Sequence, residues 1–303
     1  QYAPTSTGCR GCHIRCKKRT ADDRALPEFE TMSHFSALLG NHSLEAVMTA
    51  NHICNIMGMD TITAGATLAC FAELEERRLP PAEIHTLLTD IALGKGVGKD
   101  LAVGAARLAR KYGKPETAMT VKGLELSAYD PRGAYGMALA FAVSNRGACH
   151  LRAYPISHEI LRKPVATDRL SFAGKARIIK INEDMNAAAD SLTACKFVFF
   201  AASLEEYARV LQAVTGQPVS GHDLLAAGER IVYQERIMNA ANGFGADDDD
   251  LPQRFFEPPA SGDTARPLDR DAFVTARNNY YRVRGLDSNG QPTPKKTSEL
   301  GLE

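Results

Sequence analysis

Three cysteines stand within eight residues near the start of the chain, as Cys9, Cys12 and Cys16. The spacing C-x2-C-x3-C lets one short loop turn three sulfurs inward onto a compact metal centre, and Gly11 leaves room for the turn. The chain has seven cysteines among 303 residues, an odd number in a large protein, so a disulfide scaffold is not expected. Such a cluster is typical of metal binding in a reducing compartment, and we therefore expect a cytoplasmic protein.

The spacing of the triplet is compatible with two kinds of metal centre. An iron–sulfur cluster needs four ligands, and the fourth often comes from a distant part of the chain. Zinc is the alternative, with His13 counted as a fourth ligand. Spacing alone puts iron–sulfur only modestly ahead of zinc. The basic residues around the triplet would favour an anionic, thiolate-rich cluster; they are Arg10, Arg15, Lys17 and Lys18.

The composition excludes several classes of protein. Hydrophobic residues make up 44% of the chain and charged residues 24%, which is an ordinary globular balance. Thirty-six basic residues meet thirty-six acidic ones, whereas a general nucleic-acid binder carries a basic excess. No apolar run approaches the ~18–20 residues that a membrane span needs. We expect neither nucleic acid nor membrane among the partners.

Helical patterns dominate both halves of the chain, so the expected fold class is mainly α, with two helical domains. Asp60, Ser203 with Glu206, and Ser220 are the clearest helix-starting signals. Residues 118–128 are expected to be irregular or extended, which places the domains at 1–118 and 119–303. The acidic run 247–250 is expected to be a solvated loop, and the polar tail to be frayed. The expected helices are 44–57, 60–78, 81–94, 100–112, 134–144, 171–189, 203–215, 220–242 and 269–284.

Two short segments look related to each other. Residues 55–60 (NIMGMD) end in an aspartate before a helix, and residues 190–195 (DSLTAC) begin with an aspartate and end in a cysteine. Each places polar groups where a helix meets a turn, a natural place to hold a polar ligand. Either aspartate alone could equally be a helix cap. Taken with the triplet, Cys195 is the natural fourth thiolate.

In the order and spacing of these motifs the chain resembles the tungsten-containing aldehyde ferredoxin oxidoreductases. The resemblance covers nearly the whole chain. The paired pattern of that family is D-x-x-G-L-(C/D), and this chain departs from it at Asn55, Met59, Thr193 and Ala194. Single motifs would be weak, but their shared order is specific. They lie at 8–16, 27–31, 54–62, 96–101, 121–125, 145–152, 190–195, 250–255, 280–285 and 289–293.

The resemblance implies a [4Fe–4S] cluster and a tungsten (or molybdenum) bis-pterin as cofactors, shared at the interface of the two helical domains. The cluster ligands would be Cys9, Cys12, Cys16 and Cys195. The pterin contacts would come from the two aspartates of the paired motifs and two further positions. Those residues are Asp60, Asp190, Arg152 and Ala194.

The resemblance also assigns the proton chemistry to Glu30 and His150. A carboxylate suits a base and an imidazole suits a proton donor to a carbonyl oxygen. Each residue has a structural alternative: Glu30 as a carboxylate that complements a helix dipole, and His150 as a core histidine. The implied Tyr before the glutamate is Phe29 here, so its hydroxyl is lost.

The implied activity is oxidation of an aldehyde to a carboxylic acid, with electrons passed to ferredoxin. The chain begins at Gln1, just ahead of the triplet, so we expect it to be part of a longer system. The expected partners are ferredoxin, an aldehyde substrate and an N-terminal β domain, in cis or in trans. A homodimer is a further expectation.

Three rival functions stay open at this point. One is a non-catalytic iron–sulfur electron-transfer or accessory subunit derived from the same family, which would keep the four cysteines without needing Glu30 or His150. A second is a zinc-binding module that touches nucleic acid through residues 10–19, which the charge balance and the distant Cys195 argue against. A third is reduction of an aromatic thioester by an enzyme of the same family.

Overall fold

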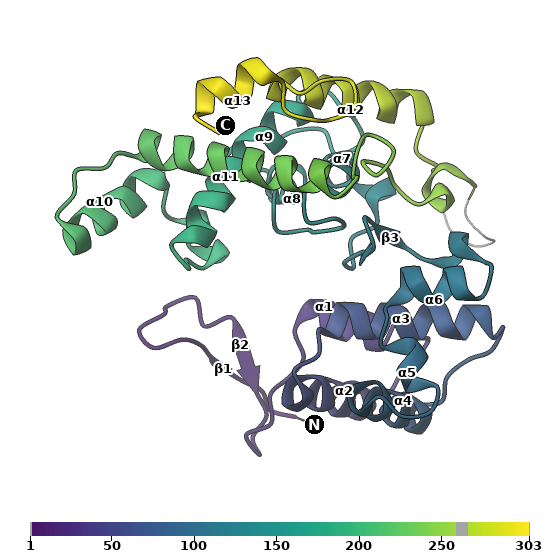
Figure 1. Cartoon of the computed structure of the whole chain (residues 1–303). Coiled ribbons are helices and arrows are strands. Elements are labelled where there is room, and N and C mark those ends of the chain that lie inside the picture. Colours follow the sequence, from purple (N-terminus) through teal and green to yellow (C-terminus); the bar gives the residue numbers. More distant parts are fainter. Residues whose placement is uncertain (1, 259–265, 303) are drawn as a thin grey trace. The chain divides into compact units, whose positions relative to one another are not determined.

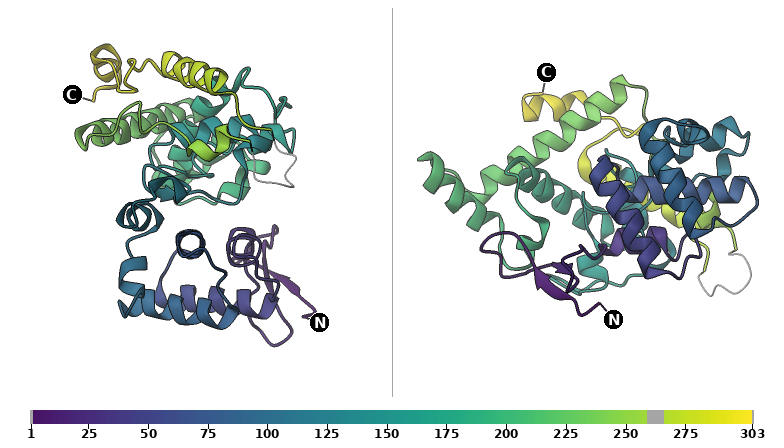
Figure 2. Two further views of the ribbon diagram at one scale, coloured as in Figure 1. Left: turned by 90° about the vertical axis from the view of Figure 1, so that its right-hand side faces the viewer. Right: turned by 90° about the horizontal axis from the view of Figure 1, so that it is seen from below.

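The computed structural model describes residues 2–258 and 266–302, and the chain divides into two compact units, Gln1–Ala128 and Tyr129–Glu303 (Figures 1 and 2). Residues 1, 259–265 and 303 lie outside the described part. The described residues are mainly helical, as the sequence indicates. Among them, no helix is both long enough and apolar enough to cross a membrane.

The first unit packs its helices around a core of aliphatic and aromatic side chains. Phe35, Leu68, Leu88 and Leu108 are fully buried in that core, one from each of four helices. Their burial removes apolar surface from water and holds the helices together. The helices are α1 (Phe29–Phe35), α2 (Leu44–Met57), α3 (Thr61–Leu74), α4 (Pro81–Leu93), α5 (Gly98–Leu101) and α6 (Ala105–Lys111).

Two short antiparallel hairpins complete the first unit. β1 (Thr5–Thr7) pairs with β2 (Lys17–Arg19), and Thr7 lies opposite Lys17. The three clustered cysteines therefore occupy the loop that joins these strands. After the 3₁₀ helix η1 (Pro115–Thr117), β3 (Thr120–Val121) pairs with β4 (Leu124–Glu125).

The compact units divide after Ala128, ten residues beyond the expected domain boundary at residue 118. The difference has a physical cause, because η1 and β4 pack on helices of the first unit. Glu125 is buried there and accepts hydrogen bonds from the Ala105 amide at 2.9 Å and the Thr63 hydroxyl at 3.0 Å. The hairpin is therefore part of the first core.

One expected helix is broken in two. Residues 100–112 were expected to form one helix, but α5 ends at Leu101 and α6 begins at Ala105. Gly104 between them has φ +85°, outside the helical region, and the Ala105 amide bonds to Glu125 instead of to a helical carbonyl. A contact from a distant hairpin thus sets the break.

The second unit is built around α9, which packs against α11 and α12 (Figures 1 and 2). The capping box predicted for Ser203 and Glu206 is formed, and Ser220, predicted only as a helix start, forms a second one with Asp223. Two short helices, α8 with four residues and α13 with seven, were not expected from the sequence. The α helices are α7 (Tyr135–Val143), α8 (Ile156–Glu159), α9 (Lys175–Ser191), α10 (Leu204–Thr215), α11 (Gly221–Ala241), α12 (Arg270–Arg284) and α13 (Pro294–Leu300), and the 3₁₀ helices are η2 (Pro131–Gly133), η3 (Lys196–Phe200) and η4 (Gln253–Phe256).

Buried ion pairs tie the helices of the second unit together. Arg284 on α12 is almost fully buried and pairs with Asp184 at 2.6 Å and Glu183 at 2.7 Å, both on α9. Lys175 and Glu159 form another buried pair at 2.9 Å. Removing one member of such a pair leaves an uncompensated buried charge, so these pairs also fix which helices meet.

Two expectations for the second unit are wrong. The acidic run was expected to be solvated, but Asp249 is fully buried, where Arg236 donates to it at 2.7 Å and the Tyr281 hydroxyl at 2.7 Å. The tail was expected to be frayed, but α13 forms, capped at its start by Thr293. Arg236 compensates the buried charge of Asp249, and Thr293 caps α13. Neither contact can be read from the local composition.

Candidate functional site

The cysteine triplet lies at the tip of the β1–β2 hairpin. Cys9 and Cys16 are exposed, Cys12 is partly exposed, and all three are free thiols. The turn is held by the Cys12 amide, which donates to the Cys9 carbonyl at 3.0 Å, and by Gly11 at φ +74°. In the described part of the chain no three His, Cys, Asp or Glu side chains already surround a metal-sized space. The three thiols are close in sequence, but their side chains do not point to one common position.

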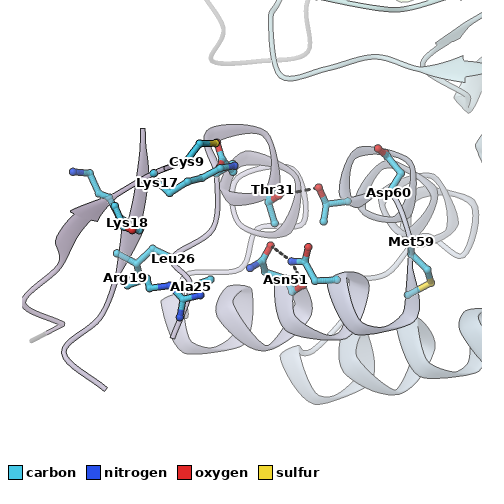
Figure 3. Close-up of a pocket in the computed structure, with 15 residues that line it drawn as sticks. Cys9, Lys17, Lys18, Arg19, Ala25, Leu26, Thr31, Asn51, Met59 and Asp60 are labelled. Carbon is cyan, nitrogen blue, oxygen red and sulfur yellow. Dashed lines mark hydrogen bonds and ion pairs between the residues drawn. The ribbon is translucent and has the colours of Figure 1, made fainter. Parts of the chain in front are cut away.

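A hollow of about 620 Å³ opens beside this hairpin within the first unit (Figure 3). Cys9 and the basic strand β2 line one end, and Asp60 and Met59 line the other. Two motifs that are far apart in the sequence therefore share one cavity, between the hairpin and the start of α3. Its lining residues are Thr7, Gly8, Cys9, Lys17, Lys18, Arg19, Ala25, Leu26, Glu28, Thr31, Asn51, Asn55, Met59, Asp60 and Thr61.

Asp60 begins α3 and has a capping role. Its Oδ1 accepts from the Thr63 amide at 2.7 Å, which satisfies one free donor of the first helical turn. The residue after it, Thr61, shares a hydrogen bond of 2.8 Å with Thr31 across the hollow (Figure 3). The capping alternative is therefore confirmed for Asp60, and its exposed carboxylate still lines the hollow.

Glu30 lies one residue before Thr31, in the first turn of α1. Its side chain is largely buried, and its Oε2 accepts from the Ala128 amide at 2.8 Å. Burial raises the pKa of Glu30, while the Ala128 amide and the nearby His34 oppose that rise. A carboxylate with an elevated pKa is suited to proton transfer near neutral pH.

The two paired segments have the same backbone geometry. In the first, the amides of Gly58 and Met59 donate to the carbonyls of Asn55 and Cys54. In the second, the amides of Thr193 and Ala194 donate in the same pattern, to the carbonyls of Asp190 and Ala189. The fourth position of each motif is left-handed, with φ +68° at Gly58 and +53° at Thr193. Threonine keeps a conformation for which glycine is the ordinary choice.

Asp190 lies near the end of α9 and is flanked by two cations. Lys196 Nζ lies 2.6 Å from Asp190 Oδ1, and an Arg152 guanidinium nitrogen lies 3.8 Å from Oδ2. Arg152 also pairs with Glu235 on α11 at 2.8 Å. Burial lowers the pKa of Lys196, and its hydrogen bond to Asp190 opposes that change. Cys195, an exposed free thiol, stands directly before this lysine.

His150 is partly buried in the second unit, and its ring stacks on Tyr129 with the ring centroids 5.6 Å apart. Its neighbour Cys149 is buried beside the Arg146 side chain, 3.8 Å from the sulfur. Cys54 and Cys70 are also buried, and burial raises the pKa of Cys54 to about 12. A thiol with a raised pKa stays protonated and is a poor metal ligand.

The donor sets present suit the cofactors that the sequence indicates. Iron–sulfur clusters are held by accessible thiolates, and the four candidate ligands are all free and at least partly exposed. An aminopyrimidine edge needs acceptors such as carboxylates, and Asp60 and Asp190 each carry an exposed one.

Several site residues were missed by sequence reasoning. Lys196 follows a predicted ligand directly, but no helical spacing connects it to Asp190, so only the structure shows their contact. His34 is four residues from Glu30, a spacing that does place two side chains on one helix face. The basic residues of β2 were expected only to favour an anionic cluster by their charge, and not to line a cavity.

Comparison with known proteins gives one consistent result. The family described as "Aldehyde ferredoxin oxidoreductase, domains 2 & 3" matches residues 1–302. The tungsten-containing aldehyde ferredoxin oxidoreductases of Pyrococcus furiosus and Thermococcus kodakarensis are each 36% identical to the chain, over 100% of it and 53% of each relative. The chain thus spans about half the length of these curated relatives.

Two more distant proteins share the same region. The WOR-like subunit of an aliphatic sulfonate oxidoreductase from Pyrococcus furiosus is 25% identical over 96% of the chain and 49% of that protein. The active-site complex BamBC of benzoyl coenzyme A reductase matches with a TM-score of 0.78, covering 98% of this chain and 52% of that one. At 15% identity this second likeness shows the fold alone.

Proposed function

Because the chain belongs to the aldehyde ferredoxin oxidoreductase family, we propose that it supplies the cluster- and pterin-binding half of an enzyme that oxidises aldehydes to carboxylic acids. One observation carries the proposal: Cys9 and Asp60, from two separate motifs, line a single hollow. The other half of the enzyme is proposed to be a β domain, in cis or in trans.

The proposed ligands follow from the donor chemistry of the two units. Cys9, Cys12, Cys16 and Cys195 would hold the [4Fe–4S] cluster, since each is a free thiol. Asp60, Asp190, Arg152 and Ala194 would contact the two pterins. When bound, the tungsten (or molybdenum) bis-pterin would take two electrons from the substrate, and the cluster would release them one at a time to ferredoxin.

The proposed reaction consumes water and releases protons. An aldehyde and one water give a carboxylic acid, two protons and two electrons, so the protein must accept protons near the carbonyl carbon. Glu30 would take that role, and its support is a buried carboxylate that accepts from the Ala128 amide and whose pKa is raised by burial. His150 would donate a hydrogen bond to the carbonyl oxygen, with its ring plane fixed by Tyr129.

A direct experiment is anaerobic purification followed by metal analysis and electronic absorption. The proposal expects four irons and sulfide per chain, and tungsten or molybdenum only when the β domain is present. The isolated chain is expected to be inactive toward aldehydes and poorly loaded with pterin. Aldehyde oxidation by the isolated chain at an ordinary enzymatic rate would overturn this account of the missing half.

The second candidate is an electron-transfer or accessory subunit that binds the cluster without a pterin. The observation that favours it is that both aspartates among the proposed pterin contacts already have partners, since Asp60 caps α3 and Asp190 is paired with Lys196. The same preparation distinguishes the two functions: iron without tungsten, molybdenum or pterin in the complete complex would select the accessory subunit.

A further inference from the structure

The β1–β2 hairpin and the segment that follows it carry more positive than negative charge. Residues 2–28 contain six Lys and Arg side chains against three Asp and Glu, although the whole chain holds thirty-six of each. Every acid of the segment already has a basic partner there; the pairs are Lys17–Glu28, Arg19–Asp23 and Arg24–Asp22. Arg10, Arg15 and Lys18 are exposed, and the described part of the chain holds no carboxylate within ion-pair distance of them. Three cations thus remain uncompensated.

The pleat of β2 separates Lys18 from the paired cations. Successive side chains of a strand point to opposite faces, so Lys18 lies on the other face from Lys17 and Arg19. In Figure 3 the Lys18 side chain extends away from the hollow, whereas that of Lys17 extends toward Cys9. One face of the ribbon therefore bears an exposed cation that no acid neutralises.

Two of the uncompensated cations are held on Ser6 of β1. Lys18 Nζ donates to Ser6 Oγ at 3.3 Å, directly across the ribbon, and Arg15 Nη2 donates to the Ser6 carbonyl oxygen. Both acceptors are neutral, so the two positive charges stay available to a partner. Ile14, the neighbour of Arg15, is an exposed apolar side chain. We name Ile14, Arg15 and Lys18 the hairpin patch.

The chemistry of the hairpin patch favours an acidic protein. Contacts between proteins combine an apolar centre with a polar rim, and complementary charge steers the encounter. A nucleic acid fits less well, because its binding draws on a larger basic excess and the three acids of the same segment would repel phosphates. The patch adjoins the cysteine loop: Arg15 directly precedes Cys16, and a Cβ on Gly8 would lie 3.0 Å from the Arg15 Cα. A protein seated on the patch would therefore reach the loop that carries the exposed Cys16 thiol.

We propose that the hairpin patch is a docking surface for an acidic one-electron carrier protein of the ferredoxin class. This rests on the proposed function, because the electron must come from a cluster held by the cysteine loop. One electron would pass from the cluster to the oxidised centre of the carrier, so the first is oxidised and the second reduced, with no bond made or broken. Each aldehyde releases two electrons, so two carriers must come and go, which suits a weak contact steered by charge.

Docking can be measured without turnover. The complete enzyme, with the proposed β domain and the cluster in place, would be immobilised, and an oxidised bacterial-type ferredoxin with an acidic surface would be passed over it in surface plasmon resonance. The Debye length falls from ~30 Å at ~0.01 M salt to ~10 Å at ~0.1 M. Binding through the hairpin patch should therefore weaken over this range, chiefly by slower association.

Charge reversal tests the patch itself. Arg15→Glu with Lys18→Glu should weaken ferredoxin binding by ~10–100-fold at ~0.01 M salt. The matched control is Lys95→Glu with Arg110→Glu, which changes the net charge equally. Both are exposed cations of the first unit for which the described residues supply no ion pair. The control should bind ferredoxin as the wild type does, to within ~3-fold.

A second variant covers damage to the cysteine loop. If the protein with Arg15→Glu and Lys18→Glu loses its iron, Lys18→Glu alone serves, since Lys18 lies on β2, outside the loop between the strands. This single reversal should weaken ferredoxin binding by ~3–10-fold.

Three results would overturn the inference. One is unchanged binding in the charge-reversed protein, and another is an equal loss in the control pair, which would make total charge the cause. The third is a wild type that binds no ferredoxin at low salt; protection of Lys18 from an amine-reactive reagent would then identify the β domain as the occupant, and capture of duplex DNA a nucleic acid. Ferredoxin binding through the patch by an enzyme that oxidises no aldehyde would instead remove the proposed activity and leave the docking surface, so the two failures are distinguishable.

Discussion

Replacing Thr193 with glycine should stabilise the second unit. Thr193 has φ +53°, and a left-handed backbone costs an L-residue ~1–2 kcal/mol, with β-branched residues at the upper end. Its side chain is exposed, so little packing is lost with it. Glycine also increases the conformational entropy of the unfolded chain, which lowers the free energy of unfolding by ~0.5–1 kcal/mol. The net expectation is a gain of about 0.5–1 kcal/mol.

The reciprocal change is the matched control. Gly58 holds the same place in the first motif with φ +68°, and a Cβ there would meet open space. Gly58→Thr therefore introduces backbone strain without a clash, and it should destabilise the first unit by ~1–2 kcal/mol.

Thermal and urea unfolding followed by circular dichroism would measure both effects. For a unit of this size a change of 1 kcal/mol moves the melting temperature by ~2–4 °C. Thr193→Gly should raise the melting temperature and Gly58→Thr should lower it, with unchanged dependence on urea concentration. A lower midpoint for Thr193→Gly, or an unaltered one for Gly58→Thr, would refute the strain argument.

Four further outcomes are expected. Gly228→Ala should destabilise the second unit by ~1–3 kcal/mol in urea unfolding, because the new Cβ would lie 1.9 Å from the Asp184 carbonyl oxygen, whereas Gly133→Ala, in open space, should be near neutral. Cys195→Ala should lose cluster iron and sulfide in metal analysis, and full retention would refute its assignment as a ligand. Glu30→Gln in the loaded enzyme should lower turnover by ~10²–10⁴-fold with cluster and pterin intact; near-normal turnover would exclude Glu30 from the mechanism. Lys196→Met should weaken pterin retention by ~10–100-fold through the loss of its charged hydrogen bond to Asp190, while Lys196→Arg keeps most of it; equal pterin content in the two variants would contradict this.

Local signals in the sequence predicted the helices that start with their own caps. Asp60, Ser203 and Ser220 each bond to amides a few residues ahead, so the information lies within one turn. The break before Ala105 depends on Glu125, twenty residues away, and the burial of Asp249 depends on Arg236 and Tyr281. Those contacts arise only when distant elements pack, so composition could not predict them.

The candidate site divides in the same way. The motifs supply the candidate ligands, because thiols and aspartates at fixed spacing indicate their own chemistry. The residues that contact them lie outside the motifs. His34 lies one helical turn after Glu30 on α1, and Lys196 contacts Asp190 across the turn that follows α9. A pattern of ligands is local, whereas their supporting contacts depend on the fold.

The strands that carry the cysteine loop are only three residues long, and this affects how the protein would mature. A two-stranded ribbon of this length is marginally stable alone in water, and the segments that open first in a protein are those with few buried contacts. A cluster-delivery protein could therefore reach Cys9, Cys12 and Cys16 after the helical core has formed, at the cost of local fraying only. Until the proposed cluster is delivered, the same accessibility leaves these thiols open to oxidation. The yield of mature protein would then depend on whether the cluster is inserted faster than oxygen oxidises the thiols.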